Sequence, residues 1–215
     1  MIEQRLGMRT RIKICGITDS ESAAAAVEAG ADAIGLMFVE HSPRCISAEH
    51  AKHIVQYVLP PFVNAIAVFQ NPSADDDPNV TTWPGSWVQM HGDEDAEFLN
   101  GLPHHVIKAC PFEPDAVRMW ATNDAVDALL VDGPRGGSGD SFDHERLAEM
   151  MPEIQKPVIL AGGLTPDNVG EAIRTIRPFA VDVSSGVEHT RGVKDPAAID
   201  AFCRAVRAAD QSMLE

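Results

Sequence analysis

The chain has 215 residues, 45% of them hydrophobic, which is enough for one large domain with its own core. Its formal net charge of -15 argues against nucleic acid or an anionic membrane as a partner, because either would require a basic patch and the sequence shows none. The four cysteines are widely spaced and form no Cys-x-x-Cys pair, a pattern that fits reduced thiols better than a zinc site or a disulfide framework.

The first ten residues form a polar start to the chain. Met1 to Thr10 include charged and polar side chains throughout and lack the apolar stretch of a secretory signal. No later segment has the length and apolar character of a membrane span. We interpret residues 1–10 as an N-terminal extension and expect a cytoplasmic protein.

From residue 11 onward, short apolar runs rich in β-branched residues alternate with helical segments, and no linker divides them. Near-continuous apolar runs such as 33–38 and 66–69 are typical of parallel strands covered by helices. The repeated order predicts an α/β fold, a single-domain (β/α)8 TIM barrel over residues 11–207, with a C-terminal tail at 208–215. The expected strands are 11–17, 32–38, 63–69, 86–91, 106–111, 128–132, 157–161 and 180–184.

Capping and stop signals predict the ends of three helices. Asp19 is expected to cap a helix that runs through residue 29 and stops at Gly30. Pro166 and Asp167 are expected to begin a helix that ends near residue 176, and Asp195 to cap a last helix through residue 206.

The segment at 71–85 contains too many prolines, glycines and β-branched residues for a regular helix. We therefore expect an irregular third crossover in the barrel. A doubly wound open sheet is the alternative fold, but no Gly-x-Gly-x-x-Gly follows the first strand, where such a fold would bind a dinucleotide.

Glycine-rich segments follow the last two expected strands. Gly162 and Gly163 come after the seventh, and Ser184, Ser185 and Gly186 come at the end of the eighth. Exposed backbone N–H groups beside a helix N-terminus bind phosphate, and the loops after these strands are the usual place for it in barrels. A single Gly-Gly pair would be read as a tight turn, whereas two such strand ends favour a phosphate site.

Three side chains near other strand ends have both a chemical and a structural interpretation. Cys15 is either a small buried apolar residue or, at the barrel mouth, a thiolate that removes a proton from carbon. Asp132 either caps the loop that follows its strand or acts in the site. Arg44 is either a solvated loop charge or a bidentate partner for a substrate carboxylate.

Seven segments resemble the phosphoribosylanthranilate isomerase family, along nearly the whole chain from about Arg11 to Val206. One such segment would be a weak signal, but seven in order are specific. They are Lys13-Ile-Cys15-Gly-Ile-Thr18, Gly30-Ala-Asp32-Ala-Ile-Gly35, Ser42-Pro-Arg44, Gln89-Met-His91-Gly92, Gly136-Gly-Ser-Gly139, Ala161-Gly-Gly-Leu-Thr-Pro166 and Arg177-Pro-Phe-Ala-Val-Asp-Val-Ser-Ser-Gly-Val-Glu188.

The resemblance implies an Amadori rearrangement of N-(5-phosphoribosyl)anthranilate in L-tryptophan biosynthesis, without a metal or an organic cofactor. Asp132 would be the general acid on the furanose ring oxygen, and Cys15 would then remove the C2 proton. Because the iminium is its own electron sink, the reaction requires neither a Schiff-base lysine nor a metal. Arg44 would bind the anthranilate carboxylate of this small-molecule substrate.

The resemblance also assigns the remaining site residues. The phosphate would be held by Gly162, Gly163, Ser184, Ser185 and Gly186. Gln89, His91 and Asp182 are expected to line the wall of the site. His91 is an alternative acid–base group, because the reference pKa of histidine is near neutrality, and it is ranked below Asp132. A monomer and a homodimer are both compatible with the sequence.

The chain departs from the family pattern after Gly136-Gly-Ser-Gly139. Members often continue with a lysine or another polar residue and Phe-Asp-Trp, whereas this chain reads Asp140-Ser-Phe-Asp143-His144. The loop after Asp132 is also short. Extra negative charge from Asp140 would weaken the binding of an anionic substrate, although we expect this side chain to point outward.

Two other functions compete with the isomerase interpretation. Another cofactor-free phosphosugar isomerase or epimerase would keep the phosphate site but would have no reason for Arg44. A non-catalytic phosphometabolite-binding barrel would need neither Cys15 nor Asp132.

Overall fold

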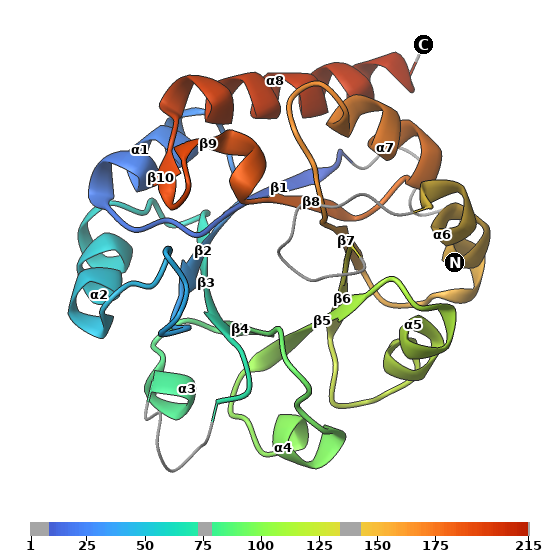
Figure 1. The fold of residues 1–215 in the computed structure, drawn as a ribbon, viewed down its shortest axis with the longest axis horizontal. Helices are drawn as coiled ribbons and strands as arrows, with labels where there is room; N and C mark the ends of the chain where they lie inside the picture. Colours follow the sequence, from blue (N-terminus) through green and yellow to red (C-terminus); the bar gives the residue numbers. More distant parts are fainter. Residues whose placement is uncertain (1–8, 73–78, 134–142, 215) are drawn as a thin grey trace.

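The computed structural model describes residues 9–72, 79–133 and 143–214, and it contains a closed barrel of eight parallel strands in chain order (Figure 1). The barrel closes where β1 pairs with β8, with Lys13 opposite Asp182. The predicted fold is therefore confirmed. The strands are β1 (Arg11–Cys15), β2 (Ala33–Met37), β3 (Asn64–Phe69), β4 (Trp87–Met90), β5 (His105–Pro111), β6 (Ala128–Asp132), β7 (Val158–Leu160) and β8 (Ala180–Val183).

Helices surround the barrel on its outside, one after each strand (Figure 1). They are α1 (Ser20–Glu28), α2 (Ala48–Tyr57), α3 (Asn79–Thr82), α4 (Ala96–Asn100), α5 (Pro114–Ala121), α6 (His144–Met150), α7 (Val169–Ile176) and α8 (Pro196–Ser212). Two 3₁₀ turns, Met151–Glu153 and Ser185–Val187, and a small antiparallel pair, β9 (Glu188–Thr190) with β10 (Val193–Lys194), complete the described elements. The pair β9–β10 lies between β8 and α8 in the chain, on the side of the mouth where β1 and β2 also end (Figure 1).

The first strand and the first helix begin and end for local reasons. We predicted a strand to residue 17, but β1 ends at Cys15 because Gly16 has a left-handed φ of 76°. The predicted cap of the first helix is confirmed, since the Asp19 carboxylate accepts a hydrogen bond from Ser22 N at 2.7 Å.

The predicted start of α7 is wrong by three residues. Its first residue is Val169, because Asn168 holds the preceding residues in a turn. The Asn168 side chain accepts a hydrogen bond from Thr165 N at 2.8 Å and donates one to Gly163 O at 2.9 Å. Asn168 thus fixes the loop that carries the two expected phosphate-binding glycines.

The last helix starts as predicted but ends later. Asp195 accepts a hydrogen bond from Ala197 N at 2.9 Å, and α8 then continues past Val206 to Ser212. Its buried face extends to Ala209, and Asp210 accepts a hydrogen bond from Thr10 N at 2.8 Å. Much of the expected tail is therefore helical, while the boundaries of extension, barrel domain and tail stay a prediction.

The third crossover has the expected irregular character in the part that is described. Its helix, α3, has only four residues, and residues 73–78 lie outside the described structure. Trp83 follows this helix and is buried, with its ring 5.8 Å from that of Phe38 in an edge-on arrangement. A large aromatic side chain thus packs against Phe38 directly after this short helix.

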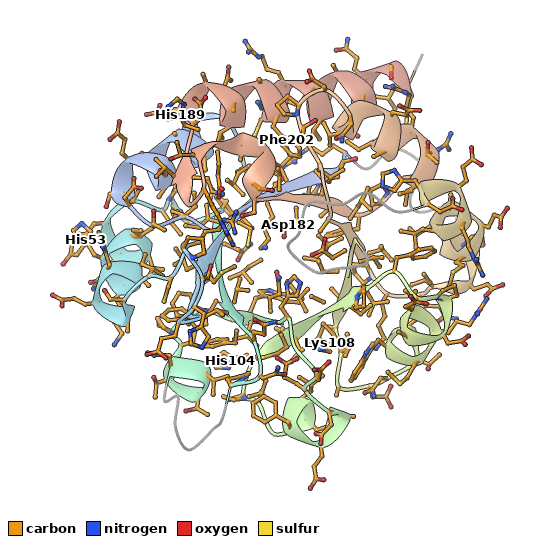
Figure 2. All side chains as sticks on the ribbon, viewed as in Figure 1. His53, His104, Lys108, Asp182, His189 and Phe202 are labelled. Carbon is orange, nitrogen blue, oxygen red and sulfur yellow. The ribbon has the colours of Figure 1, made fainter. Side chains whose placement is uncertain are left out.

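The core has two layers, one inside the barrel and one between strands and helices. The outer layer includes the fully buried Phe202 of α8, which lies between that helix and the strands (Figure 2). The inner layer is made mostly of small side chains, which leaves room for polar groups nearer the mouth: Ala33, Ile66, Ile107, Ala109, Ala128, Leu130, Ile159, Ala161 and Ala180.

A buried ion pair ties the loop after β4 to β5 on the outside of the barrel. Lys108 Nζ lies 2.7 Å from Glu94 Oε2, both side chains are 2% exposed, and the ammonium is 5.4 Å from the Trp120 ring (Figure 2). Glu94 also accepts hydrogen bonds from Asn71 N and Gly92 N. These contacts satisfy the carboxylate and fix the loop that follows His91.

Candidate active site

The register of the strands directs several of the expected site residues into the barrel. Lys13 pairs with Ala33 and Gln89 with Ile107, and both partners belong to the inner layer of the core. Side chains alternate along a strand, so Cys15 points inward with Lys13. Asp132 is the last residue of β6, as predicted, and Cys15 is the last residue of β1, two residues before the predicted end of that strand.

Cys15 lies beside a buried ion pair formed across the closing strands. Lys13 Nζ is 2.9 Å from Asp182 Oδ1, and the two side chains are 3% and 8% exposed. Asp182 lies inside the ring of strands (Figure 2). A Cβ atom on Gly35 would lie 2.6 Å from Cys15 Sγ, so the absence of a side chain there makes room for the thiol. Burial raises the pKa of Cys15, while the charges of Lys13 and Lys194 oppose that rise.

Asp132 belongs to a short polar chain on the opposite side of the barrel. Its Oδ1 accepts a hydrogen bond from Gly133 N at 2.7 Å, and its Oδ2 lies 3.4 Å from His91 Nε2. His91 Nδ1 is in turn 3.2 Å from Gln89 Nε2. The structure thus brings together three residues that the sequence placed at the mouth, with Asp132 almost fully buried and His91 partly exposed.

The glycine-rich loops after β7 and β8 approach each other and the end of β6. Gly162 and Gly163 have φ angles of 87° and 62°, which favour glycine. A Cβ atom on Gly162 would lie 2.5 Å from Gly133 N and 2.9 Å from Asp132 Oδ1. Within the described ranges, the N–H groups of Gly163 and Ser185 donate no hydrogen bond to other protein groups. They are available to an anion at this end of the barrel.

Substituting Gly186 by alanine is expected to distort the glycine-rich loops after β7 and β8. A Cβ atom there would lie 1.9 Å from Leu164 O, and because this is a backbone atom, the loop itself would have to shift. We expect a loss of stability of about 1–3 kcal/mol and a higher KM, measured by denaturant unfolding and steady-state kinetics. Gly101→Ala is the matched control, because its nearest contact would be 3.4 Å, and equal behaviour of the two variants would contradict this expectation.

Arg44 forms a two-point ion pair that the sequence did not reveal. Its Nε and Nη2 lie 2.6 and 2.9 Å from the two carboxylate oxygens of Glu188, the first residue of β9. Lys194 Nζ lies 3.0 Å from the same carboxylate and donates to Ser184 O at 2.9 Å. Although burial acts in the other direction, Arg44, the N–H of Gly192 and Lys194 lower the pKa of Glu188 to about 2.

Sequence reasoning missed Lys13, Glu188 and Lys194 as members of this site. A lysine between Ile12 and Ile14 in a buried strand was a usable signal, because a charge there requires a partner. Glu188 and Lys194 follow β8 in a segment without a regular pattern, so only the fold shows that they meet Arg44. The Gly136-Gly-Ser-Gly139 segment and Asp140 lie outside the described residues.

Comparisons with known proteins agree with these features. The family described as N-(5'-phosphoribosyl)anthranilate (PRA) isomerase matches residues 12–205. A relative from Pseudomonas fluorescens, an N-(5'-phosphoribosyl)anthranilate isomerase, is 44% identical over 94% of this chain and 98% of its own.

Solved structures of the same enzyme are similar to this chain as well. The crystal structure of phosphoribosyl anthranilate isomerase from Thermotoga maritima has a TM-score of 0.83 and 38% identity, over 93% of this chain and 99% of its own. A structure of the enzyme in complex with reduced 1-(o-carboxyphenylamino)-1-deoxyribulose 5-phosphate has a TM-score of 0.80 and 36% identity, with the same coverage.

Proposed function

The chain belongs to the family of N-(5'-phosphoribosyl)anthranilate isomerases and is an isomerase of tryptophan biosynthesis, and we propose that Asp132 and Cys15 carry out its reaction. The reaction is the Amadori rearrangement of N-(5-phosphoribosyl)anthranilate to 1-(2-carboxyphenylamino)-1-deoxyribulose 5-phosphate. One observation carries the assignment of residues: an acid and a thiol end two strands of the same barrel, between an arginine and glycine-rich loops.

In the first step, protonated Asp132 gives its proton to the furanose ring oxygen. The C1–O bond breaks with its electrons going to oxygen, and the nitrogen lone pair forms a C1=N iminium. The carboxyl is held by Gly133 N at 2.7 Å and faces His91 Nε2 at 3.4 Å. His91 is therefore a positioning residue that is also suited to return a proton to Asp132 between turnovers.

In the second step, the Cys15 thiolate removes the proton from C2. The C–H electrons form a C1=C2 bond, and the iminium π electrons return to nitrogen, which gives an enolamine that tautomerises to the ketone. Burial raises the pKa of Cys15 in the unliganded protein. The positive charge of the iminium favours the thiolate at the moment it is needed.

Binding of the two anionic ends of the substrate orients it for both proton transfers. Arg44 would bind the anthranilate carboxylate, and Gly162, Gly163, Ser184, Ser185 and Gly186 would hold the phosphate. Holding a substrate at both ends places the reacting atoms against fixed groups, which is a large source of rate enhancement. Gln89 lines the wall of the site and orients His91. Asp182 lies deeper in the barrel and acts through its ion pair with Lys13.

The decay of phosphoribosylanthranilate fluorescence on addition of purified protein tests this function directly. We expect rapid loss of the signal without added metal or cofactor. A folded wild-type protein that causes no loss would overturn the proposal and would leave a phosphate-site barrel of another substrate class.

Arg44→Ala is expected to raise KM for phosphoribosylanthranilate by about 10- to 100-fold, because a bidentate charge-assisted interaction is lost. Steady-state kinetics measure the effect, and kcat should change much less. Arg191 is a neighbouring exposed arginine, and Arg191→Ala serves as the control for the loss of a positive charge near the mouth. An unchanged KM in Arg44→Ala would favour another phosphosugar isomerase or epimerase.

The pH dependence of kcat/KM follows from the environment of Cys15. Its pKa is raised, so the thiol persists to higher pH than usual, and the reactive thiolate fraction of the free enzyme increases with pH. The mechanism also needs Asp132 protonated, and the protonated fraction of an acid falls with pH as the thiolate fraction rises, so the two effects offset each other between the two pKa values. We expect kcat/KM to stay nearly flat through neutrality and to fall only above pH ~8.5, the ordinary pKa of a cysteine. A kcat/KM that already falls as the pH rises from about 7 to about 8.5 would contradict a Cys15 base with a raised pKa.

The cellular location and the oligomeric state of the protein are two further properties. No helix in the described part of the chain combines the length and the apolar character that crossing a membrane requires. We propose a cytoplasmic location and a monomer or homodimer, with a small phosphorylated metabolite as the partner. Light scattering after gel filtration distinguishes the two assembly states.

A further inference from the structure

Glu188 is a heavily bonded carboxylate near the mouth, and the mechanism above gives it no role. It accepts hydrogen bonds from Arg44 Nε and Nη2, from Lys194 Nζ and from Gly192 N. Its side chain is 4% exposed, and that of Lys194 is fully buried. A buried carboxylate with four donors is held in one orientation.

The geometry of the pair determines which edge of the guanidinium remains for a ligand. Arginine binds carboxylates in a two-point manner either through Nε and Nη2 or through Nη1 and Nη2. Glu188 occupies the first edge. Among the described residues, Nη1 of Arg44 forms no hydrogen bond, so the second edge is the one open to a further carboxylate.

The stem of Arg44 is fixed as well. A Cβ atom on Gly16 would lie 2.5 Å from Arg44 Cδ and 3.1 Å from Ser184 Oγ, so the arginine crosses the end of β1 directly beside the residue that follows Cys15. On the other side, Gly192 of the β9–β10 turn packs against the backbone of Pro43. Both the stem and the head of Arg44 are therefore held before any substrate is present.

We propose that Glu188 is a positioning residue that presents the Nη1–Nη2 edge of Arg44 to the carboxylate of the substrate. This inference rests on the proposed role of Arg44 and adds the residue that sets its orientation. Without Glu188, the long arginine side chain would lose its rotational freedom only when the substrate binds, and this loss of entropy would lower the affinity for the substrate. Glu188 accordingly confers selectivity for ligands that carry the carboxylate.

Isothermal titration with two ligands tests this role without requiring turnover. One ligand is reduced 1-(o-carboxyphenylamino)-1-deoxyribulose 5-phosphate, and the other is the matching anilino compound that lacks the ring carboxylate. The dissociation constant of the anilino compound divided by that of the carboxylate ligand measures how much the carboxylate contributes to affinity. In Glu188→Gln we expect this ratio to fall at least about tenfold, while the affinity for the anilino compound changes by less than about threefold.

Glu94→Gln is the matched control, because Glu94 is also a buried carboxylate paired with a lysine and bonded to backbone N–H groups, but it lies beside β5. Its ratio should equal that of the wild type. If Glu188→Gln fails to fold by circular dichroism, Glu188→Asp keeps the charge but shortens the reach, and the same fall in ratio is expected.

Three results would count against the inference or its premise in distinguishable ways. An unchanged ratio in a folded Glu188 variant overturns it, since Glu188 is then only structural. A higher ratio in Glu188→Gln also overturns it, because Glu188 would then compete with the substrate for Arg44. A wild-type protein that turns over substrate but shows no preference for the carboxylate ligand refutes the role of Arg44 itself.

Discussion

Asp132→Asn is expected to lower kcat/KM for phosphoribosylanthranilate by about 10²- to 10⁴-fold, the range for loss of a general acid. The amide has nearly the same shape and can still accept the hydrogen bond from Gly133 N, but it cannot give a proton to the ring oxygen. The loss should therefore fall on kcat more than on KM. Steady-state kinetics by fluorescence give both constants.

Two further variants separate this effect from structural damage. Asp127 lies just before β6 at the opposite end of the strand, where it accepts a hydrogen bond from Val106 N, and Asp127→Asn should leave kcat within about threefold of the wild type. His91→Gln should cost less than Asp132→Asn, because His91 acts through the carboxyl. A larger loss in His91→Gln would make His91 the general acid instead.

Cys15→Ser is expected to reduce kcat/KM by a similar factor of about 10²–10⁴. The serine hydroxyl is far less acidic than a thiol, so it cannot supply the base that removes the C2 proton. The site around it, with Gly35 beside the sulfur and the Lys13–Asp182 pair below, accepts the smaller oxygen without a clash. Single-turnover kinetics with substrate deuterated at C2 report on this step directly.

The buried Cys203 of α8 provides the control for the loss of a thiol. It is fully buried in the outer layer of the core, so Cys203→Ser should cost stability in thermal unfolding without a comparable loss of kcat. A Cys15→Ser enzyme that keeps most of its activity would exclude the thiol as the base, and the C2 proton acceptor would have to be sought elsewhere at the mouth.

The barrel could be predicted because its signals are local. Each strand is an apolar run of a few residues, and the caps at Asp19 and Asp195 depend on a neighbour within three positions. The same reasoning placed Cys15 and Asp132 at strand ends. It misplaced the start of α7 because Pro166 is a plausible first helical residue, whereas the hydrogen bond from Thr165 N to the Asn168 side chain keeps that segment in a turn.

The ion pairs of the site could not be predicted in the same way. Lys13 and Asp182 are 169 positions apart, and Arg44 and Glu188 are 144 apart, so no local pattern relates them. The sequence placed Asp182 only on the wall of the site and gave no role to Lys13. Only the register of β1 against β8 shows that the two charges face each other inside the barrel.

The pairing of the first strand with the last makes the site depend on the order in which the chain is synthesised. A nascent chain that has left the ribosome only as far as β7 already carries Cys15, Arg44 and Asp132. Its Lys13 has no counter-ion, and its arginine has no Glu188 to hold it. Contacts between such distant segments form late, after shorter loops have closed. A chain that ends before β8 therefore lacks both the counter-ion of Lys13 and the carboxylate that holds Arg44.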